Sequence, residues 1–143
     1  MRWFVSAVFI GLCATLPAAA QELDGRDLIA GETIYAQHCA ACHGANLEGA
    51  PDWRVRNPDG TLPAPPHDET GHTWHHDNRL LFDYTALGGE ALFAARGISG
   101  VQSGMPGFAG TLTEDQIWDV LAYIRSSWPD EVRAIQDELN AVR

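Results

Sequence analysis

The 143-residue sequence contains no lysine, so its nine basic side chains are all arginines, against 19 acidic residues. The net charge of −10 at pH 7 opposes binding to nucleic acid or anionic lipid, because like charges repel. A Ser-His-Asp triad, a phosphate-binding loop and a paired-carboxylate site are also missing. The sequence therefore predicts no catalytic residues, no nucleic-acid partner and no small-molecule substrate. A charged protein partner is expected to offer a basic surface.

Runs of alternating polar and apolar residues are absent too, which argues against a sheet with one buried face. Helical periodicity occurs instead over residues 25–44, 77–89 and 112–129, and again over 129–143 as an extra C-terminal helix. Gly, Pro, Asn and Asp crowd residues 45–76, and a loop of this length usually covers a bound group. These patterns predict an all-α fold of three to four helices with long loops.

The ends and the inward faces of these helices are marked in the sequence. Asp24 or Asp27 is expected to cap the first helix and Gly44 to end it, and Thr113 with Gln116 forms a capping box. We expect the last helix to be either packed or a frayed arm. The residues expected to face inward are Leu80, Leu81, Tyr84 and Leu87 in the second helix, Ile117, Val120, Leu121 and Ile124 in the third, and Val132, Ile135, Leu139 and Val142 in the last.

Residues 1–20 have the pattern of a secretory signal peptide. Arg2 precedes an apolar run over residues 3–16, and an A-x-A site ends at Ala20. The run is shorter than the roughly 20 residues of a spanning helix, so an uncleaved anchor is disfavoured. The pattern predicts cleavage after Ala20 and export to the periplasm of one soluble, monomeric domain over 21–143.

Cysteine is scarce. Cys13 lies in the expected signal, which leaves Cys39-Ala40-Ala41-Cys42-His43. A thioredoxin-like disulfide needs a β-α-β surround, and a structural zinc needs a second pair of ligands, and neither is present. Cys-x-x-Cys-His is the signature of c-type haem attachment. It predicts one covalent haem c, with both thiols bonded to the porphyrin and His43 as the proximal iron ligand.

Met105 is the only methionine after residue 20. A lone methionine often fills a gap in a core, but the Gly and Pro neighbours in SGMPGF place this one in a loop. Its thioether can there serve as the distal iron ligand. Ligation by His and Met raises the reduction potential and leaves no open coordination position, which favours electron transfer.

The haem motif, Met105-Pro106 and the following helix, in this order, resemble the class I c-type cytochromes over nearly the whole chain after residue 20. The resemblance implies a single-haem electron carrier with outer-sphere transfer, whose partners are an oxidase, a reductase or a dehydrogenase. The last part is most similar to the haem c domains of cbb3-type oxidases.

The resemblance also assigns packing and orienting roles. Gly31 and Tyr35 match one side of the helix crossing typical of the family, and Val120 and Tyr123 match the other. A proline carbonyl is expected to orient His43. Four prolines compete for that role: Pro51, Pro63, Pro65 and Pro66.

The segment 67–77 is richer in histidine than the family requires, with His67, His72, His75 and His76 beside Asp68 and Asp77. Neutral imidazoles bind copper, zinc or nickel, so these four histidines are a candidate second metal site. They can instead line the haem edge, and Asp77 can simply cap the next helix. A histidine replacing Met105 at iron is a further alternative.

Two other functions fit the same motifs. A haem enzyme or sensor needs a sixth ligand that dissociates, and rapid binding of carbon monoxide to the reduced protein distinguishes it. An electron-transfer or copper-handling subunit needs a permanent partner, which residues 129–143 can dock.

Overall fold

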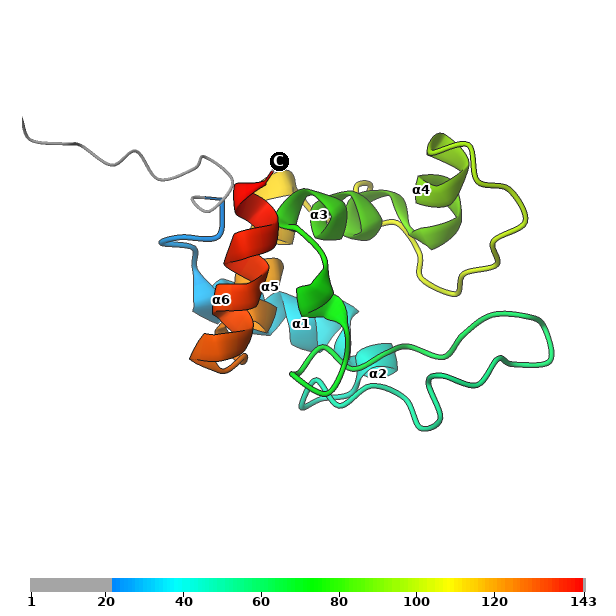
Figure 1. Cartoon of the computed structure of the whole chain (residues 1–143), viewed down its shortest axis with the longest axis horizontal. Helices are drawn as coiled ribbons and strands as arrows, with labels where there is room; N and C mark the ends of the chain where they lie inside the picture. The colour runs from blue at the N-terminus through cyan, green and yellow to red at the C-terminus, as the bar shows by residue number, and fades with distance from the viewer. Residues whose placement is uncertain (1–21, 143) are drawn as a thin grey trace, which may run out of the picture.

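We describe residues 22–142 of a computed structural model of the chain. The expected signal peptide and its cleavage site therefore lie outside the described residues. The described part is helical without strands, and the all-α expectation is confirmed. Its helices are α1 (Leu28–His38), α2 (Ala40–His43), the 3-10 turn η2 (Thr73–His75), α3 (Asn78–Leu87), α4 (Gly89–Ala95), α5 (Glu114–Ser126) and α6 (Asp130–Ala141) (Figure 1).

The expected count of three to four helices is too low. A separate short helix, α2, follows α1, and α4 was not expected at all. Gly88 ends α3 with φ 81° and at the same time starts α4, so one glycine separates two helices. No helix among residues 22–142 has the length and apolar character needed to span a membrane.

The crossing of α1 and α5 forms the centre of the molecule. A Cβ atom on Gly31 would lie 2.8 Å from Cβ of Tyr123 and would overlap the backbone of Asp119, so only glycine allows this approach. Tyr35 and Val120 are each 1% exposed beside it. The four crossing positions expected from the sequence are therefore confirmed as contact positions.

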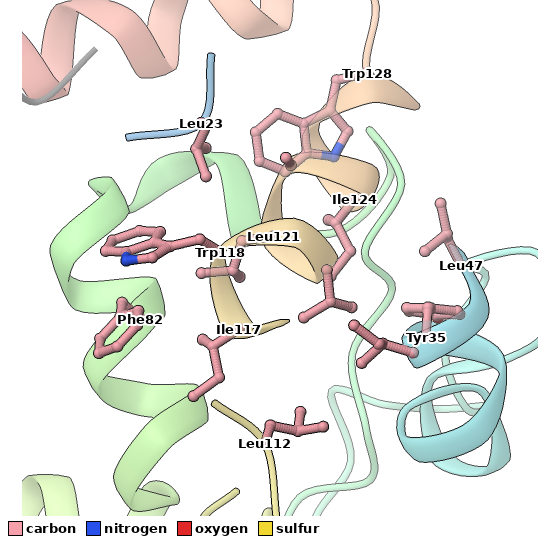
Figure 2. Packing of buried hydrophobic residues seen from close by; sticks show 13 residues of the cluster. Leu23, Tyr35, Leu47, Phe82, Leu112, Ile117, Trp118, Leu121, Ile124 and Trp128 are labelled. Carbon is pink, nitrogen blue, oxygen red and sulfur yellow. The ribbon is translucent and has the colours of Figure 1, made fainter. Parts of the chain in front are cut away.

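The expected apolar stripe of α5 is confirmed, because Ile117, Val120, Leu121 and Ile124 are all buried. Figure 2 shows Trp118 facing α3, where its ring stacks on Phe82 with centroids 4.4 Å apart. The capping box of Thr113 and Gln116 is present, with both of its hydrogen bonds formed.

The expected inward faces of α3 and α6 are confirmed only in part, since Leu81 and Val132 pack against the core. In α3 the buried side chains are Asn78, Phe82 and Thr85, because α5 lies on that side, and Leu87 is exposed. In α6, which is packed rather than frayed, the buried side chains are Gln136 and Asn140.

Candidate haem-attachment site

The two cysteines lie at a joint between helices. Asp27 caps α1 by accepting hydrogen bonds from the amides of Ile29 and Ala30, and Cys39 ends this helix. One turn of α2 then carries the chain to Gly44, which ends it with φ 83°. The amide of Cys42 donates to the carbonyl of Cys39 at 3.1 Å, so the two side chains start one turn apart.

Both cysteines are free, Cys42 exposed and Cys39 half-buried. Burial, with a smaller contribution from Cys42, raises the pKa of Cys39 to about 11. A redox-active disulfide pair normally has a cysteine with a lowered pKa. Cys39 packs against the apolar core, and its pKa is shifted in the direction opposite to that of a redox-active cysteine.

His43 is held in one orientation. Its Nδ1 lies 2.8 Å from the carbonyl oxygen of Pro65, and since a carbonyl only accepts, Nδ1 carries the proton. Nε2 is then the nitrogen with a free lone pair, which is the tautomer that a metal ligand needs. Burial lowers the pKa of His43, and this bond to Pro65 partly opposes the effect. Of the four candidate prolines, Pro65 is the one that orients His43.

His67 lies against the ring of His43. Their centroids are 4.0 Å apart with the planes at 19°, and Nδ1 of His67 lies 2.8 Å from Oγ1 of Thr73. Trp128 anchors the backbone here, because its Nε1 donates to the carbonyl of His67 at 2.7 Å. Two consecutive segments of the loop thus clamp one imidazole, Pro65 by a hydrogen bond and His67 by stacking.

The four histidines of the candidate second metal site lie against different rings. His72 stacks on Trp53, His75 stacks on Trp74, and His67 is used on His43. Among residues 22–142 no three His, Cys, Asp or Glu side chains are placed to hold a metal ion. The ring of His76 packs edge-on against His72, and metal binding by this segment stays a prediction. Asp77 accepts a hydrogen bond from the amide of Leu80 and caps α3.

Met105 lies in the loop between α4 and α5, in the vicinity of His43. Its amide donates to Oγ of Ser103 at 3.2 Å, and its carbonyl accepts from the amide of Gly89 at 3.2 Å. Further along, the amide of Phe108 donates to the carbonyl of Thr85 at 3.0 Å. The loop is therefore fixed against the end of α3, and Met105 lines an open surface hollow there.

The two long loops meet at their tips. A Cβ atom on Gly60 would lie 3.2 Å from Cδ of Gln102, which places the loop after α2 against the loop after α4. Figure 1 shows both loops projecting to the same side of the helices, on the right of the view. The segment that holds His43 and the segment that carries Met105 are therefore joined at one end, as expected for loops that wrap a flat cofactor.

These observations define a small helical domain with a site for attachment of a prosthetic group. A model of the cytochrome c family matches residues 28–128, and the chain belongs to this family. Its cofactor is haem c, bound covalently. Searches of curated proteins and of solved structures find no match. The two thiols one turn apart, beside an imidazole whose Nε2 is free, fit this group.

Proposed function

We propose that this chain is a class I, single-haem cytochrome c that passes single electrons between redox proteins in the periplasm. In this proposal Cys39 and Cys42 form the thioethers, His43 is the proximal ligand and Met105 is the distal ligand. The observation that carries it is the hydrogen bond from Nδ1 of His43 to the carbonyl of Pro65, which leaves Nε2 for the iron. Export rests on the signal pattern of residues 1–20, and similarity to the cbb3-type oxidase domains rests on residues 105–124.

The protein's part in such a reaction is to keep the ligands still. The haem iron supplies the chemistry by accepting and releasing one electron. The hydrogen bond that His43 donates to the carbonyl of Pro65 and the stacked ring of His67 stop His43 from rotating. Bonds to Ser103 and Gly89 fix the backbone at Met105 on the other side. Ligands that do not move between two oxidation states keep the reorganisation small, and the cytochrome c family supports electron transfer as the role.

The test is a spectroscopic redox titration of the haem-loaded protein and of Met105→Ala. We expect the wild type to show a methionine-to-iron charge-transfer band in the ferric state, and Met105→Ala to lose it and to have a lower potential. Ser99→Ala, an exposed position in the same loop, is the control and should leave both unchanged. A pyridine haemochrome assay should give one haem per chain, and none after Cys39→Ala with Cys42→Ala.

Two results contradict the proposal. If the ferric wild type lacks the band, a residue other than Met105 ligates the iron. If the reduced wild type binds carbon monoxide rapidly at neutral pH, the sixth position is open, and the chain is a haem enzyme or sensor.

A further inference from the structure

Helix α6 lies beyond the part of the chain that the family shares. The family match ends at residue 128, and α6 runs from Asp130 to Ala141. The core at the α1–α5 crossing is complete without it, since only Val132 of α6 packs against that core. α6 is therefore an addition whose purpose has to be found in what it contacts and what it exposes.

α6 is held to the molecule by polar side chains. Gln136 is completely buried, donates from Nε2 to the carbonyl of His76 at 3.2 Å and accepts from Nε of Arg125 at 3.0 Å. Asn140 is 2% exposed, and its Oδ1 accepts from the amide of Asn78 at 2.8 Å. Arg125 also pairs with Asp137 at 2.6 Å. Directional bonds of this kind define one rotation of the helix about its axis.

This rotation turns part of the apolar stripe of α6 outward. Val132 and Leu139 are half-buried, but Ile135 is 45% exposed and Val142 is 82% exposed. Figure 1 shows α6 on the outer surface, in front of α5. An amphipathic helix normally buries its apolar side, so a helix anchored by its polar side leaves its apolar side for another molecule.

Among residues 130–142, the unpaired charges on the exposed face are all of one sign. Glu131 and Glu138 are exposed and lie along the same helical face as Ile135 and Val142, at spacings of three and four residues. Arg133 of this helix is paired with Asp130. Among the described residues of α6, the outward face therefore offers apolar side chains and carboxylates and no unpaired cation. A second copy would set carboxylates against carboxylates, and an anionic membrane would repel them.

We propose that the outward face of α6 docks a partner protein whose surface has an apolar groove bordered by lysine or arginine. The apolar side chains supply burial and the two glutamates supply orientation and selection against other partners. The bond of Gln136 to the carbonyl of His76 ties α6 to the segment 67–77, whose first residue, His67, stacks on His43. That the partner is a redox protein rests on the proposed function; the docking surface itself does not.

The test uses the haem-loaded protein and two synthetic amphipathic helices, one of leucine and lysine and one of leucine and glutamate. We expect the leucine–lysine peptide to bind in calorimetric titration, with NMR shift changes confined to α6, and the leucine–glutamate peptide not to bind. I135E/V142E should weaken binding by about tenfold or more, although it adds two negative charges to the protein. I29E, at a 78% exposed position of α1, is the matched control and should not weaken it.

The I135E/V142E variant distinguishes binding through the apolar side chains of α6 from binding through charge attraction alone. If it binds the leucine–lysine peptide as tightly as wild type or more tightly, charge alone drives binding and the proposal is wrong. Two other results would also overturn the proposal. Dimerisation in sedimentation that disappears in the variant would mean that a second copy covers this face, and binding to anionic phosphatidylglycerol vesicles would mean that a membrane does. The haem absorption spectrum of each variant shows whether the variant is folded, and this control does not depend on the electron-carrier proposal. If I135E/V142E loses this spectrum, the peptide titration is made with V142E alone. Val142 is 82% exposed, so this substitution should not disturb the fold.

Discussion

Helices α5 and α6 follow one another in the chain and are both amphipathic, yet they are attached to the molecule by opposite sides. α5 buries an apolar stripe that includes Ile117 and Leu121, and the acidic residues of its first turn are exposed. α6 buries Gln136 and Asn140 and leaves Ile135 exposed. The difference lies in the surface that each helix meets.

The surface that α5 meets is made of side chains, chiefly Ile34 and Tyr35 of α1 and Phe82 of α3. The surface that α6 meets includes backbone groups, namely the carbonyl of His76 after η2 and the amide of Asn78 at the start of α3. Buried backbone groups need hydrogen-bond partners, so the side of α6 that faces them is polar. The periodicity of a sequence thus predicts that a helix is amphipathic, and the neighbouring surface decides which side is buried.

A pair of identical substitutions tests this contrast most strongly. Ile117 is 1% exposed in α5 and Ile135 is 45% exposed in α6. We expect Ile117→Ala to lower the free energy of unfolding by about 4 kcal/mol, because it leaves a cavity in the core. Ile135→Ala should change it by less than about 0.5 kcal/mol. Urea unfolding of both haem-loaded variants measures the difference. Equal losses in the free energy of unfolding for the two variants would mean that the apolar stripe of α6 is buried like that of α5.

The close approach of α1 and α5 gives the next largest effect. Gly31→Ala places a methyl group against the backbone of Asp119 and against Tyr123. We expect a loss of about 3 kcal/mol in the free energy of unfolding, because the two helices must move apart. Ala36→Ser, on the exposed side of α1, adds one atom and should cost less than about 0.5 kcal/mol. A neutral Gly31→Ala would show that the crossing tolerates a wider spacing.

Local signals in the sequence were sufficient for some parts of this fold. The Thr113–Gln116 capping box and the Cys39–His43 motif each depend on residues within one helical turn, so their structure follows from short stretches. α4 was missed because Gly88 and Gly89 read as a stop, although a helix restarts there.

Other parts depend on the path of the long loop, which no periodicity describes. The choice of Pro65 among four prolines and the stack of His67 on His43 both require the chain to return over α2. The aromatic partners of His72 and His75 arise in the same way, and no pattern in the sequence indicated them. The inward side of α6 could not be predicted either, because the surface that the helix meets decides which side is buried.

The polar attachment of α6 gives a smaller effect, confined to one helix. Gln136→Ala removes the bonds to His76 and Arg125, and we expect about 2 kcal/mol of destabilisation because buried polar partners lose their hydrogen bonds. Hydrogen exchange should become faster in α6 while α5 keeps its protection. Gln37→Ala, at an exposed position of α1, is the control. Loss of protection in both helices together would show that α6 is part of the core after all.

Low pH should lower the free energy of unfolding through His72 and His76, and this is the smallest of the expected effects. Burial lowers the pKa of His72 below the ordinary 6.5, helped by His75 and Arg54. It also lowers that of His76, helped by His72 and His75 and opposed by Asp77.

Below about pH 6.5 the unfolded chain therefore binds more protons than the folded one. The contribution of His72 and His76 to the free energy of unfolding is complete above that pH and falls as the pH drops toward their lowered pKa values. Both rings are partly exposed, and solvent screening keeps the effect below that of Gln136→Ala. Urea unfolding at about pH 7.5 and pH 5.5 should therefore show a larger loss for wild type than for the variant that carries both His72→Gln and His76→Gln. His43 and His67 are present in both proteins, so their own titration cancels in this difference, and equal losses would exclude His72 and His76 as its source.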